Sequence, residues 1–253
     1  MQKSYYSFLF YFTICLILFG FYCALKIGLN IDEPWHHTNG GLRYLYMTSL
    51  IKSMTTHFPK FEGYVWENNK WYPGLYDTIV YALSKLLNNF VNLKYTAEIR
   101  HSINYILSSI GVLGLFFVNK KIFNKEIAIL SCVLTLLNPI FFGHMGMNPK
   151  DPIVFTALIW TIYFFINYLE NLEGSRFKHL IFLSLIMGFG TSIRVTFIAL
   201  LIPLFLIWVF IIFKKKIKIS IIILDAFYAL VIIISLTFLT WPQMHNGEFN
   251  LLV

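Results

Sequence analysis

Long apolar runs, separated by short polar segments, dominate the pattern of the chain. Crossing the apolar layer of a membrane as a helix takes about 20 mostly apolar residues, so such runs are candidate spans. We predict spans at 6–28, 102–118, 126–142, 152–169, 179–193, 195–213 and 219–240. The first run is longer than a signal-peptide core and lacks a clear cleavage site, so we interpret it as a retained span. The pattern predicts an all-α, polytopic transmembrane helix bundle of about seven spans.

One connection, from Leu29 to His101, is far longer than the usual loop of about 4–6 residues, and such loops often carry function. Within it, apolar residues recur at spacings near three and four over 34–54, and again after Pro73. This periodicity predicts two helices lying along the membrane interface. Residues 58–72 between them have the composition of an irregular loop. We find no repeat or linker, so we expect a single membrane domain, 1–253.

The composition indicates that the chain lies in a membrane, and the distribution of charge predicts its orientation there. With 58% hydrophobic and 13% charged residues, the chain has too much apolar surface for a soluble domain of its length. The net charge of +8 lies in short clusters between apolar runs, which excludes a basic nucleic-acid-binding surface. If the N-terminus is inside, the inner segments hold Lys3, Lys120, Lys121, Lys125, Arg176, Lys178, Lys214, Lys215, Lys216 and Lys218. The positive-inside rule therefore predicts a cytoplasmic N-terminus and an extracytoplasmic long loop.

Acidic residues gather on the opposite, outer side, which the positive-inside rule does not require. They are Asp32, Glu33, Glu62, Glu67, Asp77, Glu98, Asp151 and Glu248. Six of the seven histidines fall on the same side. This asymmetry predicts a polar site at the outer surface.

The segment Asp32-Glu33-Pro34 directly follows the first span and has two interpretations. One carboxylate before a proline is typical of a helix start, so the segment could only cap the first interfacial helix. Capping, however, needs one acid, and this segment has two adjacent ones. In the functional interpretation, a carboxylate here accepts the proton of a hydroxyl that attacks an activated substrate.

A second outer loop, 143–152, contains Lys150 and Asp151, and again an acidic residue precedes a proline. It too can be a turn and a helix start, or part of a site shared with the first loop. Arg194, between two later spans, could reach lipid headgroups or hold a phosphate by two-point contact. The two loops and Arg194 together would suit a substrate that carries a phosphate.

Metal and disulfide chemistry find little support in the sequence. Cys15, Cys23 and Cys132 all fall in apolar runs, without a CxxC pair or a Cys/His ligand spacing. His36, His37 and His144 with Asp32 could form a metal site, but we interpret the histidines as interfacial polar residues. No cofactor is predicted, and a divalent metal stays open. Asp225 is a charged residue inside the last apolar run, and its position near the cytoplasmic interface explains why a charge is tolerated there.

Four motifs in order resemble the membrane-embedded C-type glycosyltransferases, nearest to the protein O-mannosyltransferase-like group and its bacterial sugar-transferase relatives. The motifs are Asp32-Glu33-Pro34-Trp35-His36, Tyr72-Pro73-Gly74-Leu75-Tyr76-Asp77, Asn148-Pro149-Lys150-Asp151 and Gly190-Thr191-Ser192-Ile193-Arg194. The resemblance implies an inverting transferase that moves a sugar from a polyprenyl-phosphate carrier to an acceptor outside the cytoplasm. It implies that Asp32 is the base, with Glu33 beside it, and that Asp151 belongs to the second loop of the site. From position and charge we expect Lys150 or Arg194 at the carrier phosphate, and His36 and Asp77 at the substrate.

Several features of this interpretation stay open. The expected location is the bacterial inner membrane, with a lipid, glycan or protein acceptor and a hexosyl or pentosyl donor. Family members usually carry more spans, whereas this chain stops shortly after Trp241-Pro242. We therefore consider both a complete and a truncated catalytic module. The alternatives are a transporter or flippase of lipid-linked sugars and a non-catalytic membrane protein. The almost charge-free spans disfavour a transporter.

Overall fold

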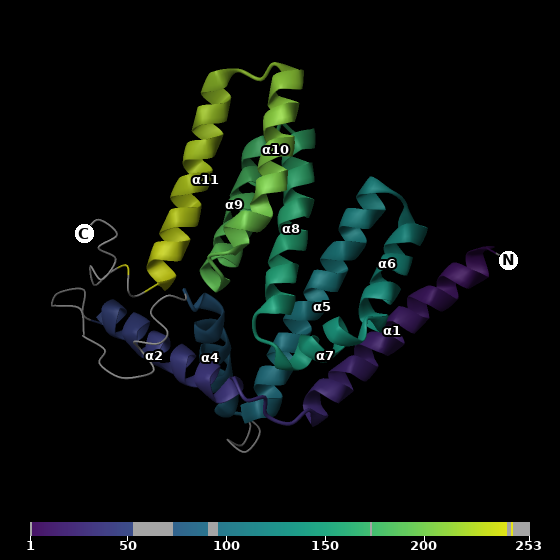
Figure 1. Cartoon of the computed structure of the whole chain (residues 1–253), viewed down its shortest axis with the longest axis vertical. Coiled ribbons are helices and arrows are strands. Elements are labelled where there is room, and N and C mark those ends of the chain that lie inside the picture. The colour runs from purple at the N-terminus through teal and green to yellow at the C-terminus, as the bar shows by residue number, and fades with distance from the viewer. Residues whose placement is uncertain (1, 53–72, 91–95, 173, 242–243, 245–253) are drawn as a thin grey trace. The chain divides into compact units, whose positions relative to one another are not determined.

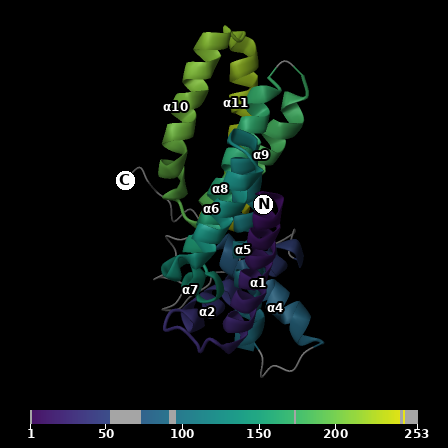
Figure 2. The same cartoon turned by 90° about the vertical axis from the view of Figure 1, so that its right-hand side faces the viewer.

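The computed structural model describes residues 2–52, 73–90, 96–172, 174–241 and 244 (Figures 1 and 2). All regular elements in these ranges are helical, as the apolar pattern predicted. They are α1 (Gln2–Lys26), α2 (Glu33–Lys52), α4 (Leu75–Asn88), α5 (Thr96–Ile122), α6 (Lys125–Leu137), α7 (Pro139–Met147), α8 (Asp151–Glu170), α9 (Arg176–Ile193), α10 (Phe197–Lys215) and α11 (Ile219–Thr240). The chain forms two compact units: residues 1–36 with 82–163, and residues 37–81 with 164–253.

The predicted spans all fall on helices, and the polytopic helical fold is confirmed. By length and hydropathy, α1, α5, α8, α10 and α11 could each cross a membrane, and the bent pair of α6 and α7 gives a sixth candidate among the described residues. The predicted span 179–193 corresponds to α9, which does not reach this standard. Its first turn contains Arg176, Lys178 and His179, which lower its mean hydropathy.

The predicted span 126–142 is one helix in the sequence interpretation but two in the structure. The chain bends by 73° between α6 and α7. Asn138 ends α6, and its side chain then accepts hydrogen bonds from the N–H groups of Ile140 and Phe141, at 3.0 and 3.1 Å. Pro139 takes the first turn of α7, where its missing N–H costs nothing. A capping residue followed by proline therefore starts a new helix inside the apolar run.

The core of the first unit joins α1, α5, α6 and α7. Its fully buried members are Ala24, Tyr105, Val112, Cys132, Leu136 and Met145. Small residues let the helices approach closely: a Cβ at Gly146 would lie 3.0 Å from the Cβ of Ala24. Tyr105 also donates a hydrogen bond to the carbonyl of Ile17, at 2.9 Å. The first contact holds α7 against the end of α1, and the second holds α5 against the middle of α1.

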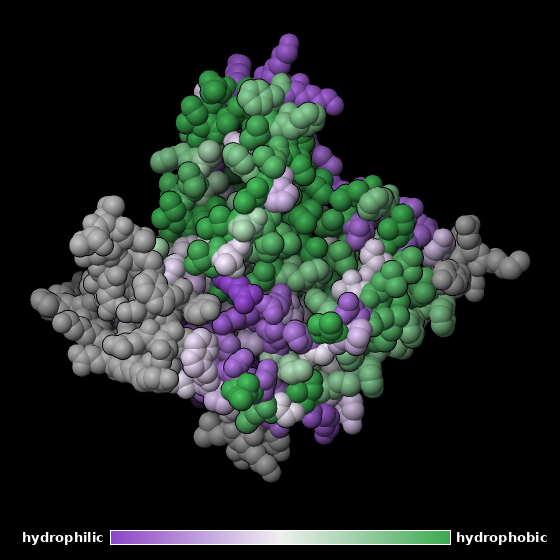
Figure 3. All heavy atoms as spheres, viewed as in Figure 1, coloured by the Kyte–Doolittle hydropathy of each residue, from purple (hydrophilic) through white to green (hydrophobic). Residues whose placement is uncertain are grey.

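The second unit contains α9, α10 and α11, with α9 packed against both neighbours. A core of Phe165, Tyr168, Leu172, Leu180 and Leu183 joins α9 to the end of α8. Apolar side chains cover the surface of α10 and α11 (Figure 3). Such a surface suits lipid contact. Lys214, Lys215 and Lys218 lie exposed where α10 turns into α11, with Lys216 closing α10 at a φ of 51°.

The two helices predicted in the long first loop are confirmed as α2 and α4. The predicted irregular segment 58–72 lies outside the described residues. In the second unit, Arg43 of α2 is 1% exposed and donates to the carbonyl of Pro73, at 2.6 Å. Asn39, one turn before it, donates to the carboxylate of Asp77 on α4, at 2.9 Å. These bonds fasten α2 to the start of α4.

The approach between these two helices also depends on Gly74. Its φ is +71°, a conformation that favours glycine, and a Cβ there would overlap the guanidinium of Arg43. Burial lowers the pKa of Arg43 to about 10, while the negative charge of Asp77 acts in the opposite direction. Arg43 therefore stays cationic at neutral pH and needs the acceptors that surround it.

Candidate functional site

The turn that leads into α2 exposes one acidic side chain and buries the next. Asp32 is exposed, whereas Glu33 is only 1% exposed. Two backbone hydrogen bonds shape the turn, from Glu33 N–H to Asn30 O at 3.2 Å and from His36 N–H to Asp32 O at 3.1 Å. Glu33 is the first residue of α2, so the predicted helix start is confirmed. The two acids thus have different environments, which a capping role alone does not require.

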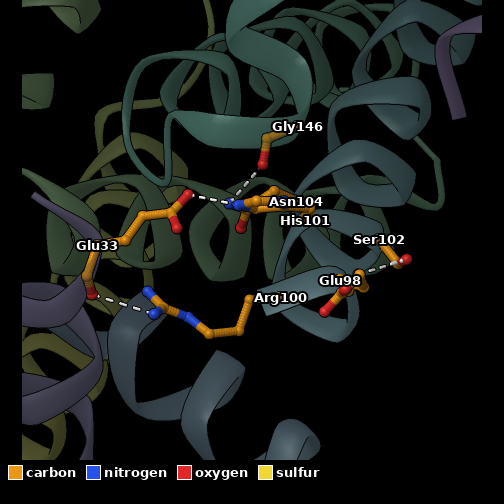
Figure 4. A network of polar contacts seen from close by, with 7 residues as sticks. All are labelled: Glu33, Glu98, Arg100, His101, Ser102, Asn104 and Gly146. Atoms are coloured by element: carbon orange, nitrogen blue, oxygen red, sulfur yellow. Dashed lines mark hydrogen bonds and ion pairs between the residues drawn. The ribbon is translucent and has the colours of Figure 1, made fainter. Parts of the chain in front are cut away.

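Two residues at the beginning of α5 hold Glu33 (Figure 4). The Nε2 atom of His101 lies 2.6 Å from Oε1 of Glu33, with both side chains buried. Arg100 donates from Nη1 to the backbone carbonyl of Glu33, at 3.0 Å. One residue therefore binds the side chain of Glu33 and its neighbour binds the main chain.

Among the residues that the structure describes, two buried atoms of the Glu33–His101 pair have no hydrogen-bond partner. These are Oε2 of Glu33 and Nδ1 of His101. An ionised Glu33 requires that Nε2 of His101 carry the hydrogen, because a carboxylate can only accept. In the neutral histidine, Nδ1 is then an acceptor, so the pair contains one donor and a surplus of acceptors. Buried polar atoms of this kind are costly and rare.

The polar face of α5 continues from the pair toward the end of α7. Asn104 donates to the carbonyl of Gly146 at 3.0 Å (Figure 4). Ser108 donates to the carbonyl of Met145, at 3.2 Å. α7 takes up residues 143–147 of the predicted second loop, so α5 anchors both the Asp32–Glu33 turn and the segment before Asn148.

Asn148, the C-cap of α7, organises the second loop that leads into α8. Its Oδ1 accepts from the N–H groups of Lys150 and Asp151, at 2.9 and 3.1 Å. Its Nδ2 donates to Oδ2 of Asp151, at 3.0 Å. α8 begins at Asp151, with Pro152 next, so the predicted helix start is confirmed here as well. The exposed carboxylate of Asp151 is held by this cap.

A cation links the second loop to the first. The ammonium of Lys150 lies 5.0 Å from the centre of the Trp35 ring, within the range of a cation–π contact. Trp35 in turn packs edge-on against His36, with ring centres 4.7 Å apart, and His36 is buried. The structure therefore brings Lys150, Trp35 and His36 together beside the Asp32–Glu33 turn.

The other two predicted site residues belong to the second unit. Asp77 is 8% exposed and accepts from Asn39, as part of the contact between α2 and α4. Arg194 is half-buried at the end of α9, where its N–H bonds to Gly190 O at 3.1 Å. The substrate role of Asp77 and the phosphate role of Arg194 both stay predictions.

Sequence reasoning missed Arg100, His101 and Asn104, and it included Asn148 in a motif without giving it a role. Arg100 and His101 were assigned to the loop before the span 102–118, whereas α5 begins at Thr96. The polar residues 101, 104 and 108 recur at helical spacing, which was a usable signal for a polar helix face. Among the described residues, no three His, Cys, Asp or Glu side chains are grouped as metal ligands would be.

Comparisons with known proteins give one match. Residues 99–241 match the model of the family described as dolichyl-phosphate-mannose-protein mannosyltransferase, which is more than half of the chain. No curated protein and no solved structure matches. The matched region includes Arg100, His101, the second loop and Arg194, and it begins after the Asp32–Glu33 turn.

Proposed function

Since the chain belongs to the dolichyl-phosphate-mannose-protein mannosyltransferase family of membrane glycosyltransferases, we propose that it transfers a sugar from a polyprenyl-phosphate carrier to an acceptor hydroxyl, with inversion. The observation that carries this proposal is an exposed acid on a turn whose neighbouring residue, Trp35, contacts the cation of Lys150. Asp32 is exposed on a turn anchored to α5, and Lys150 contacts Trp35 beside that turn. These are the two charges that such a transfer needs.

Asp32 is the proposed base. The acceptor oxygen attacks the anomeric carbon of the sugar while its proton passes to the Asp32 carboxylate. The bond between the anomeric carbon and the phosphate oxygen breaks, and the polyprenyl phosphate leaves with the electron pair. A single displacement of this kind inverts the anomeric centre. Exposure of Asp32 supports this role, because a base must reach the proton that it accepts.

Cations would hold the phosphate as its charge grows. Lys150 is half-buried and already fixed above an aromatic ring, so little of its freedom is lost when a phosphate binds. Arg194 is the second proposed phosphate ligand, because its planar group suits a phosphate. Asp151 and His36 are proposed to contact hydroxyl groups of the sugar or acceptor. For Asp77, the contact with Asn39 favours a structural contribution.

The proposed location is the bacterial inner membrane, with the N-terminus in the cytoplasm and the site outside. The positive clusters 120–125, 176–178 and 214–218 support this orientation. The donor would carry a hexose or pentose, and the acceptor would be a lipid, a glycan or a protein. No nucleic acid or cofactor is part of the proposal.

The test is sugar transfer by the purified chain in liposomes, from a radiolabelled polyprenyl-phosphate mannose to a panel of lipid, glycan and peptide acceptors. Asp32→Asn keeps the size of the side chain and removes the base, so we expect turnover to fall by about 10²- to 10⁴-fold. Asp225→Asn, in the second unit, is the matched control and should retain turnover. Undiminished transfer by Asp32→Asn would refute the role of Asp32.

A further inference from the structure

We propose that His101 is a positioning residue that fixes Asp32 by holding its neighbour Glu33. The proposal rests on the proposed role of Asp32 as the base. His101 would not touch the substrate. It would act through the buried carboxylate of Glu33 on the turn that presents Asp32.

The contact geometry supports an indirect role. His101 is 0% exposed and Glu33 is 1% exposed, and their side chains meet at 2.6 Å. The remaining polar atoms of the pair, Oε2 and Nδ1, are also buried. An acceptor hydroxyl therefore cannot reach either of them in this arrangement, so neither side chain can take the proton directly. Among Asp32, Glu33 and His101, only Asp32 is exposed.

Residue 33 is well placed to control Asp32. It lies next to Asp32 in the chain and starts α2, and three hydrogen bonds meet on it. Its N–H bonds to Asn30, its carbonyl accepts from Arg100, and its carboxylate meets His101. Arg100 binds the main-chain carbonyl of residue 33, whereas His101 binds the carboxylate and so fixes the direction of the side chain. Loss of the His101 contact should therefore allow the turn to rotate about the Arg100 bond.

Because Glu33 is buried, its carboxylate needs a hydrogen-bond donor close to Oε1. An ionised Glu33 in this environment needs hydrogen-bond donors, and Nε2 of His101 is the donor at its Oε1. A glutamine at 101 can place its amide nitrogen near the position of Nε2. An asparagine carries the same amide on a side chain one carbon shorter, so it cannot reach. These two substitutions differ in reach and not in chemistry.

The first test measures order at residue 32 without any assay of transfer. A nitroxide spin label is attached to Asp32→Cys after the three native cysteines are replaced by serine, and its mobility is measured in liposomes. We expect a restricted label in the His101 protein and in His101→Gln, and a mobile label in His101→Asn. Equal mobility in all three proteins would overturn the proposal.

The second test measures turnover with the native Asp32. We expect His101→Asn to lower kcat by about 10- to 100-fold with the donor KM unchanged, because misplacement of a catalytic group affects the reaction more than binding. His101→Gln should stay within about threefold of the wild type. His179→Asn, outside the pair, is the control. Wild-type kcat in His101→Asn would contradict the positioning role.

The two proposals can fail separately. If Asp32→Asn is fully active, the proposed base is wrong, and the spin-label result still decides whether His101 orders the turn. If Asp32→Asn is inactive and His101→Asn is as ordered and as active as the wild type, only the positioning role of His101 is refuted.

Discussion

Glu33 in the first unit and Asp225 in the second are equally buried acids, each 1% exposed, yet their partners differ. Oδ2 of Asp225 accepts from the Tyr168 hydroxyl at 2.8 Å and from Arg176 Nε at 3.1 Å, and Oδ1 lies 3.3 Å from the same Nε. Within the described parts of the chain, Glu33 has one side-chain partner, and its Oε2 has none. Burial of a charge is therefore a poor guide to function, and the completeness of its hydrogen bonding is a better one.

The cluster around Asp225 joins α8, α9 and α11 and leaves none of its acceptors unused. Such an arrangement stabilises one packing of the helices. The cluster around Glu33 lies one residue from an exposed acid and keeps buried polar atoms that a purely structural cluster would satisfy. Polar arrangements that are locally unfavourable tend to occur at functional sites.

The largest effect on stability should follow from Asp225→Ala. Removing the carboxylate leaves Tyr168 and Arg176 without their acceptor, and breaking a buried pair in this way costs about 3 kcal/mol. The side chain of Arg176 is 25% exposed, so the loss should fall at the lower end of the range for buried pairs. Thermal unfolding in detergent would measure it. The folded fraction should keep its turnover, and a loss of turnover larger than the loss of folded protein would contradict the purely structural role.

A smaller effect is expected when the Glu33 pair is removed in two steps. His101→Leu leaves a buried carboxylate without a donor and should cost about 2 kcal/mol. Glu33→Leu combined with His101→Leu removes both polar partners, so most of that stability should return. The double variant should stay impaired in transfer because the turn keeps the Arg100 bond but has lost the side-chain contact that fixes its direction. Unfolding and turnover measured on the same preparations would separate the effect on stability from the effect on transfer. Recovery of both in the double variant would contradict a functional role for the Glu33 pair.

The smallest effect is expected from Tyr168→Phe. This change removes one hydrogen bond to Asp225 and keeps the ring in the core, so it should cost about 1 kcal/mol. Arg176 still serves the carboxylate, and turnover should not change. A shift in unfolding as large as that of Asp225→Ala would mean that Tyr168, and not Arg176, satisfies the acid.

Much of the fold follows from local patterns. Apolar runs gave the helices of the bundle, and spacings of three and four gave α2 and α4. The break at Asn138 and Pro139 carried a signal, since proline cannot continue a helix without losing a hydrogen bond, but the long apolar run 126–142 hid it. The sequence therefore predicted one span over 126–142 where the structure has two helices, because the apolar composition of the run masked the effect of one proline.

The candidate site was less predictable. Asp32, Lys150 and Asp151 could be selected because acids and cations are rare in this chain and adjoin the spans. The partner of Glu33 lies 68 residues further on, and no local pattern gives a pairing over that distance. The position of Lys150 over Trp35 likewise depends on how α1, α5 and α7 pack, which the sequence alone does not specify.

The short α6 has a consequence for the lipid around it. Its 13 residues rise about 20 Å, whereas the apolar layer of a bilayer is about 30 Å thick. Because α7 turns away by 73°, the pair does not make up the full difference by length alone. A bilayer that matches α6 has to thin beside it. Headgroups, and any phosphate carried on a lipid, can therefore lie deeper here than around the longer helices.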